Sequence, residues 1–199
     1  MSTLIHKRSY DCEAFEEGEG RMRVRGRLVD DKPQGLGLAD GEPMVIHDMV
    51  IDLIITVPEF LIEGVETTMN VHPYQVCTDV LVDYQQLVGL SITRGYSRKV
   101  RELFGGPNGC SHMGALLQAL GPVAVQASWS LITLHDDPAK RLEEDTDAEG
   151  RERRLRMNTN TCHVWAEEGE QMTAVALGIT PKRPRWESDR LQKLGVDID

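Results

Sequence analysis

Cysteine and histidine side chains stand where predicted strands and helices begin or end. His47 lies in a predicted strand, and Cys77 precedes a predicted helix. Cys110 and His112 fall in the first turn of a later, long predicted helix. Thiolate and imidazole ligands together suit Zn²⁺ or Fe²⁺. We therefore predict that one divalent metal ion, zinc or iron, is held by His47, Cys77, Cys110 and His112.

Cys110 has the strongest local signal. The run Gly105-Gly106-Pro107-Asn108-Gly109 predicts a sharp bend, and a long helical pattern follows from Cys110. Backbone N–H groups at a helix N-terminus carry partial positive charge, which stabilises thiolate over thiol. Such a thiolate beside the His112 imidazole suits either a nucleophile or a metal ligand. We favour the ligand because Cys77 and His47 supply further donors.

An ion with an open coordination position would polarise a substrate oxygen or lower the pKa of a bound water. This chemistry is typical of a metal-dependent lyase or hydrolase acting on a small organic molecule. We predict a lyase that cleaves a carbon–carbon or carbon–oxygen bond beside a metal-bound oxygen. Asp48 is the predicted base because it is adjacent to His47. Strand alternation points Asp48 to the opposite face unless the strand begins after it.

The sequence gives weaker reasons to place the other cysteines at the metal site. Cys12 lies in a polar leader, and we expect no role for it. Cys162 and His163 point to opposite faces of a predicted strand, so at most one of them can join a shared site. Whether Cys162 joins it is left open. Four scattered cysteines predict reduced thiols rather than a disulfide framework.

The periodicity of apolar residues predicts an α+β fold, in which an antiparallel sheet has helices packed on one face. Residues 21–29 alternate strictly, with four arginines on one face and apolar side chains on the other. Residues 30–43 are a predicted loop. The remaining predicted elements are a hairpin over 44–57 and 60–71, a second hairpin over 161–166 and 172–179, and helices after Cys77, over 96–104 and from Cys110. We predict one domain over residues 1–180 and a C-terminal tail over 181–199.

The composition limits the classes of partner that we expect for this protein. The chain has 199 residues and 32 acidic against 22 basic side chains, a formal net charge of −10. Nucleic acids and anionic membranes need a cationic surface, so both are disfavoured and a small-molecule substrate is expected. We find no secretory leader, no apolar run of about 18 residues and no nucleotide-binding motif. We therefore expect a cytoplasmic protein, and the composition also allows a homo-oligomer.

Two resemblances rest on these residues. The segments Cys77, Leu87-Val88-Gly89-Leu90, Gly95 and Gly105–Met113 resemble a bacterial family of unknown function, whose members have a Gly-Cys-Ser/Thr-His helix start. The likeness covers roughly residues 5–180 and implies no particular activity.

The order of elements is also similar to the NifU-type iron–sulfur cluster assembly scaffold, which implies a NifU/IscU-like core. That scaffold has Cys-Gly-Asp at a strand start, a cysteine after the next strand and His-Cys opening a later helix. His47-Asp48, Cys77 and Gly109-Cys110 occupy these places here. His47 and Gly109 depart from the pattern. Because cluster irons prefer thiolates, the mixed ligand set favours one ion over a cluster.

Three functions follow, in order of preference. The first is the metal-dependent enzyme. The second is an interaction module, in which the cysteines and histidines are ordinary core residues. The third is a non-catalytic scaffold or carrier for iron or an iron–sulfur cluster.

Overall fold

The structure is a computed structural model that describes residues 2–18, 20–37, 41–135, 148–179 and 185–195. The chain divides into two compact units, Met1–His135 and Asp136–Asp199. The predicted boundary at residue 180 lies outside the described residues, and the domain extending to it stays a prediction.

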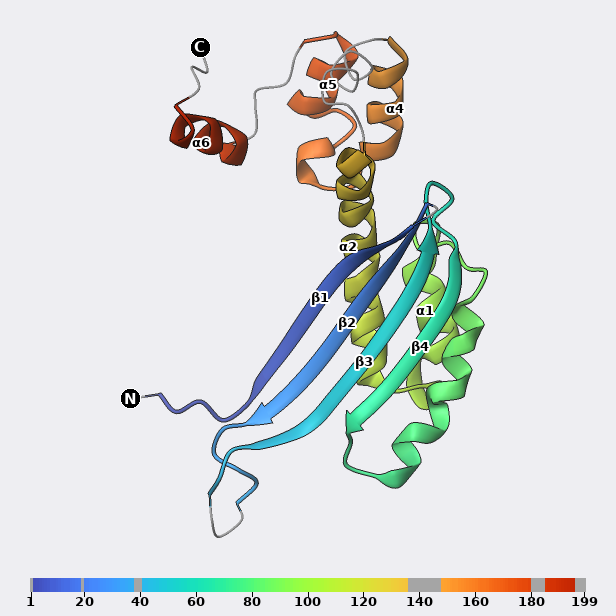
Figure 1. Ribbon diagram of the computed structural model, residues 1–199, viewed down its shortest axis with the longest axis vertical. Coiled ribbons are helices and arrows are strands. Elements are labelled where there is room, and N and C mark those ends of the chain that lie inside the picture. Colours follow the sequence, from blue (N-terminus) through green and yellow to red (C-terminus); the bar gives the residue numbers. More distant parts are fainter. Residues whose placement is uncertain (1, 19, 38–40, 136–147, 180–184, 196–199) are drawn as a thin grey trace. The chain divides into compact units, whose positions relative to one another are not determined.

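The first unit is a four-stranded antiparallel sheet with helices on one face, which confirms the predicted α+β class (Figure 1). The strands follow one another in the order β1-β2-β3-β4. Their bounds are β1 Lys7–Gly18, β2 Arg21–Lys32, β3 Met44–Thr56 and β4 Ile62–Val71. The helices are the 3₁₀ helix η1 Gln75–Leu87, α1 Tyr96–Phe104, the short 3₁₀ helix η2 Gly106–Asn108 and α2 Ser111–His135.

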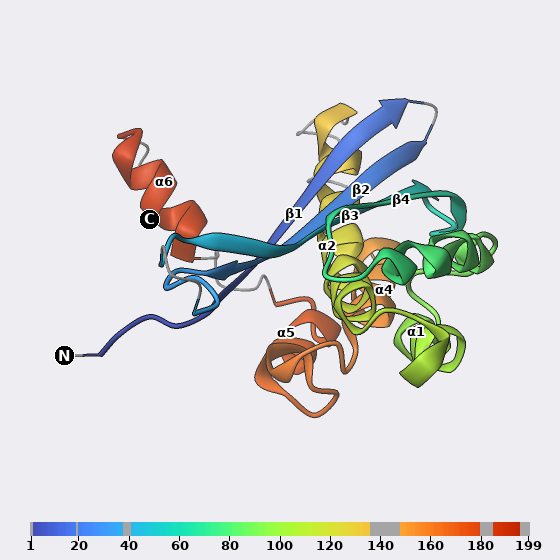
Figure 2. The same ribbon diagram turned by 90° about the horizontal axis from the view of Figure 1, so that it is seen from below.

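Strand alternation sends the apolar side chains of the central strands to one face, where α2 covers them (Figure 2). This buried face is here called the inner face. On β2 and β3 its core residues are Met22, Val24, Leu28, Met49, Ile51, Leu53 and Ile55. The helix contributes Met113, Leu116, Leu117 and Leu120.

Gly26 allows α2 to approach β2 closely. A Cβ atom built at Gly26 would lie 2.9 Å from side-chain carbons of both Leu116 and Leu120. Because glycine has no side chain, the two leucines fill that space. This contact fixes where α2 crosses the sheet, and therefore where its first turn lies.

The opposite face, here called the outer face, carries the arginines that alternate along β2. Arg27 makes a bidentate ion pair with Asp48, and Arg25 makes one with Asp52. The two aspartates on β3 are buried beneath guanidinium groups that remain well exposed. The predicted solvated arginine face is thus a row of paired charges.

One end of the sheet gathers five chain segments. The register pairs Lys7 with Asp31, Lys32 with Met44 and Asp48 with Val71. The start of β1, the end of β2, the start of β3 and the end of β4 therefore meet at one end, where α2 also begins (Figure 1).

The second unit contains α4 Ala148–Asn158, the 3₁₀ turn η3 His163–Trp165, α5 Glu170–Ala176 and α6 Arg185–Lys193. The predicted second hairpin is wrong, because its two segments form η3 and α5. Each segment has few residues, and so short a pattern distinguishes strand from helix poorly.

The α2 segment Ser111–Ile132 is long and apolar enough to cross a membrane by length and composition, with a mean hydropathy of 1.3. The buried core helix of a soluble protein passes the same test, so this is weak evidence for a span. Within the described structure, one face of α2 packs on the sheet. The cytoplasmic location stays a prediction.

Candidate metal centre

A polar row crosses the inner face at the end where the five segments meet. The register places Arg8 of β1 opposite Asp30 of β2, and Asp30 opposite His47 of β3. The Arg8 guanidinium donates to both carboxylate oxygens of Asp30, from Nε at 2.6 Å and from Nη2 at 2.7 Å. His47 Nδ1 lies 2.9 Å from Asp30 Oδ2. Three neighbouring strands thus each supply one member of the row.

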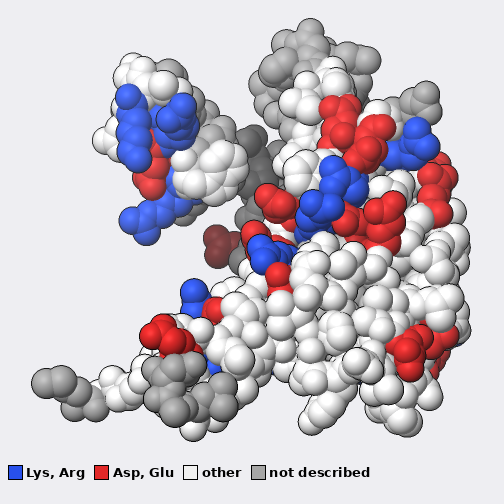
Figure 3. Space-filling model, turned by 60° about the horizontal axis from the view of Figure 1, so that its bottom comes forward, with Lys and Arg blue, Asp and Glu red and all other residues white. Residues whose placement is uncertain are grey.

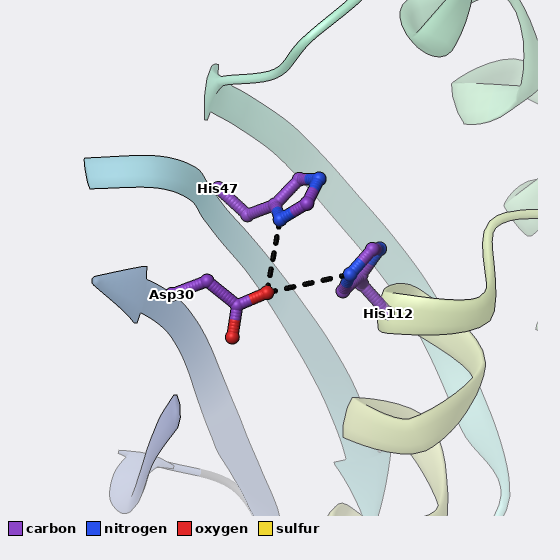
Figure 4. Close-up of side chains that lie close together, drawn as sticks. All are labelled: Asp30, His47 and His112. Atoms are coloured by element: carbon purple, nitrogen blue, oxygen red, sulfur yellow. Dashed lines mark hydrogen bonds and ion pairs between the residues drawn. The ribbon is translucent and has the colours of Figure 1, made fainter. Parts of the chain in front are cut away.

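His112 reaches the same carboxylate from the first turn of α2 (Figure 4). Its Nε2 lies 3.4 Å from Asp30 Oδ2. Its ring stacks on that of His47, with 3.9 Å between the centroids. His6 approaches the other oxygen, with Nε2 3.4 Å from Oδ1. Asp30 is therefore surrounded by three imidazoles and one guanidinium.

This environment keeps the buried carboxylate ionised. Asp30 is only 1% exposed, and burial alone would raise its pKa. The hydrogen bonds from Arg8 outweigh burial, and with help from His47 they lower the pKa of Asp30 to about 2. Burial, with the nearby His47 ring, lowers the pKa of His112. A carboxylate and a neutral imidazole are the forms that bind metal ions.

The start of α2 is fixed by its packing. The Cys110 carbonyl accepts the hydrogen bond of the Gly114 N–H, so Cys110 caps the helix. The Cys110 N–H donates to the buried Tyr84 hydroxyl at 3.1 Å. A Cβ at Gly109 would lie 2.7 Å from the Phe104 carbonyl oxygen, so only glycine allows the bend to pack this closely.

Cys110 borders the cluster without entering it. Its Sγ lies 3.6 Å from His112 Nδ1, the ring nitrogen that does not face Asp30. The same sulfur lies 3.9 Å from Met49 Sδ on β3. The imidazole of His112 therefore stands between a carboxylate and a thiol.

Two of the predicted ligands, His47 and His112, converge with Asp30. Among the described residues, the group whose donor atoms all lie within 4.8 Å of one another consists of Asp30, His47 and His112. Cys77 is outside that group and is partly buried against the hydrophobic core. Cys162 is exposed and belongs to the second unit.

Asp48, the predicted base, also lies apart from the cluster. It pairs with Arg27 on the outer face, whereas His47 points to the inner face. Successive residues of a strand point to opposite faces, and the strand begins before Asp48, at Met44.

Sequence reasoning missed Asp30, Arg8 and His6. The predicted loop over residues 30–43 includes Asp30, but β2 extends to Lys32. The available signal was parity: Asp30 continues the alternation of Met22, Val24 and Leu28, so a charged residue falls on an apolar face. Arg8 had no such signal, because only the pairing of β1 with β2 brings it to Asp30.

The spacing of the three donors fits a single metal ion. With bonds of about 2.1 Å, ligands stand about 3.0 Å apart at right angles and about 3.4 Å apart in a tetrahedron. The Asp30 oxygen lies 2.9 Å from the His47 nitrogen and 3.4 Å from the His112 nitrogen.

Neither the curated proteins nor the solved structures include a match to the chain. Residues 6–126 match a family described as a protein of unknown function, DUF2889. The match includes every residue of the cluster, and it ends within α2 rather than near residue 180. Because it covers more than half of the 199 residues, the chain belongs to the DUF2889 family.

Proposed function

We propose that this protein is a metal-dependent enzyme whose single divalent ion, zinc or iron, is held by Asp30, His47 and His112. The observation that carries the proposal is the convergence of these three side chains from β2, β3 and α2 at metal-ligand spacing. The proposal keeps two of the four ligands predicted from the sequence. Asp30 replaces Cys77 as a ligand. Cys110 lies next to the site but does not bind this ion.

Two histidines and one carboxylate leave coordination positions open for water or substrate. The ion would face solvent on one side, because the His47 and His112 side chains are 14% and 19% exposed while Asp30 is covered. An open position is what separates a catalytic metal site from a structural one. This supports an enzyme over a purely structural ion.

The ion would polarise a substrate oxygen or lower the pKa of a bound water, as a lyase or a hydrolase requires. Arg8 would hold the Asp30 carboxylate in place as an outer-shell partner of the ligand. His6 is the neighbouring imidazole that need not bind the ion, and it takes over the role of base that the sequence suggested for Asp48. We propose a small organic substrate and, for the reaction, a lyase.

The proposal is tested by titrating the metal-stripped full chain with Zn²⁺ in a calorimeter. We expect one ion per chain, with affinity reduced about 100-fold or more in Asp30→Asn, since outer-shell changes alone cost about 10- to 100-fold. Asp48→Asn is the matched control, an aspartate with the same kind of arginine partner on the outer face. Failure of the wild-type chain to bind, or equal losses in the two variants, would overturn the proposal.

The scaffold resemblance stays a prediction. A cluster carrier needs several thiolates around its irons, whereas the converging group supplies nitrogen and oxygen donors. Brown protein containing acid-labile sulfide would favour the scaffold, while colourless protein with stoichiometric zinc would favour the enzyme.

A further inference from the structure

We propose a second metal site beside the first, formed by Cys110, Met49 and His112 and selective for the soft cation Cu(I). The thiol comes from the residue that caps α2, the thioether from β3 and the imidazole from the first turn of α2. This site goes beyond the proposed enzyme, since it uses a different ion and two residues that the first site does not use.

The Cys110 sulfur is already spaced as a ligand from each of the other two donors. With bonds of about 2.3 Å to sulfur and about 2.0 Å to nitrogen, a trigonal ion holds two sulfurs about 4.0 Å apart and a sulfur and a nitrogen about 3.7 Å apart. The Cys110 sulfur lies 3.9 Å from the Met49 sulfur and 3.6 Å from His112 Nδ1.

The donor types select the ion. Thiolate and thioether are soft ligands that favour Cu(I), and imidazole suits copper as well. Thioethers are not among the usual ligands of Zn²⁺. Met49 is 1% exposed, so its sulfur is shielded from water and from exchange with other donors.

The backbone of Cys110 is held in position before any ion arrives. Its backbone N–H donates to Tyr84, which is buried and stacks against Phe104. Such preorganisation limits the cost of ordering the site when an ion binds.

The same thiol–imidazole contact would also suit a nucleophilic cysteine with His112 as its base. Met49 distinguishes the two roles. A nucleophile has no need of a thioether, whereas a three-coordinate ion loses one of its ligands when that thioether is removed.

The two metal sites share His112. Its Nε2 faces Asp30 and its Nδ1 faces Cys110. A neutral imidazole has one free lone pair, so it serves one ion at a time. Binding at the two sites is therefore negatively coupled, and each ion lowers the affinity of the other.

The test is a titration of the reduced full chain with Cu(I), under anaerobic conditions, against a chromogenic Cu(I) chelator. We expect one Cu(I) per chain, with affinity reduced about tenfold or more in Met49→Leu and further in Cys110→Ser, by analogy with the 10- to 100-fold cost of weaker perturbations. Met22→Leu is the matched control. Met22 is also a buried methionine of the inner face, but it lies at the start of β2, away from the end of the sheet where the site is. Thermal unfolding of each variant identifies any loss due to misfolding.

Asp30→Asn separates this inference from the proposed function. It should reduce the Zn²⁺ affinity about 100-fold or more and leave Cu(I) binding intact, and Zn²⁺ should weaken Cu(I) binding in the wild type. Capture of all Cu(I) by the chelator, or equal affinities in Met49→Leu and Met22→Leu, would overturn the copper site whatever the zinc titration shows. Cu(I) retention with no Zn²⁺ binding would overturn only the proposed enzyme.

Discussion

The two faces of the sheet carry the same ion pair in different surroundings. On the inner face, Arg8 holds Asp30 through bonds of 2.6 and 2.7 Å, and on the outer face Arg27 holds Asp48 through bonds of 2.8 Å each. Each is an arginine and an aspartate on adjacent strands. Among the residues that the structure describes, histidines join the inner pair and not the outer one: His47 from the next strand and His112 from a helix.

The difference shows that a buried arginine–aspartate pair is not itself a site. The outer pairs satisfy the charges of a sheet face, and the view in Figure 3 shows basic and acidic side chains lying next to one another on the surface. The inner pair becomes a candidate site because His47 from β3 and His112 from α2 reach the same carboxylate. Changes to the two pairs should therefore affect the metal-free protein differently, and zinc should affect it through the inner pair.

Removing the arginine of each pair should give the largest difference. In Arg8→Gln a carboxylate that is 1% exposed loses its main partner, and we expect a loss of about 3 kcal/mol in unfolding free energy, as for a broken buried pair. Arg27 is half exposed, so Arg27→Gln should cost about 1 kcal/mol. Urea denaturation measures both. Equal losses would remove the distinction between the faces.

Zinc should stabilise the folded protein by binding at the inner site and not at the outer pairs. At about 100 times its dissociation constant, a ligand of the native state adds about 2.7 kcal/mol to the unfolding free energy. We expect this gain in the wild type and in Asp48→Asn, and its loss in His112→Gln. Thermal unfolding with and without Zn²⁺ gives the comparison. A full gain in His112→Gln would exclude that imidazole as a ligand.

Acid should weaken the inner pair in a defined window. Arg8 holds the pKa of Asp30 at about 2, below the value of about 3.9 expected in the unfolded chain. The unfolded state therefore takes up its proton first, so the stabilisation is complete above about pH 4 and is lost as the pH falls through 2. The loss amounts to about 2.6 kcal/mol. Asp30→Asn should flatten this part of the stability profile, and an unchanged slope would contradict the ionised inner carboxylate.

The smallest effect should come from Arg25, because Arg23 lies 3.5 Å from the same Asp52 carboxylate and remains a partner for it. Arg25 pairs with Asp52, but its guanidinium is open to solvent and to salt. Arg25→Gln should therefore change stability less than Arg8→Gln, and its effect should shrink as salt is added. Denaturation at low and high ionic strength measures the change. An effect that is independent of salt would show that the outer pair is as shielded as the inner one.

The local pattern of the sequence predicts much of the fold. The strict alternation before Pro58 and the β-branched run after it predict the hairpin that β3 and β4 form. The glycine-rich bend predicts that a helix opens at Cys110, and α2 begins at the next residue. These signals are confined to neighbouring residues, where backbone preference and side-chain periodicity act.

The candidate site needs information that local patterns lack. Arg8, Asp30 and His47 become neighbours through the register of three strands, and His112 joins them through the packing of α2 over Gly26. Histidine and cysteine are common metal ligands, so the residue types alone were enough to predict His47 and His112 as ligands. An aspartate is common on surfaces, so only its inward parity distinguishes Asp30.

The central claim is that one divalent ion binds between Asp30, His47 and His112. Its most direct test is a crystal structure of the zinc-loaded chain, with anomalous diffraction data collected on both sides of the zinc absorption edge. We expect one anomalous peak on the inner face, about 2.1 Å from a carboxylate oxygen of Asp30 and from one nitrogen of each histidine. A peak elsewhere with these three side chains unoccupied, or a fully loaded crystal in which Asp30 still contacts both histidines directly, would contradict it.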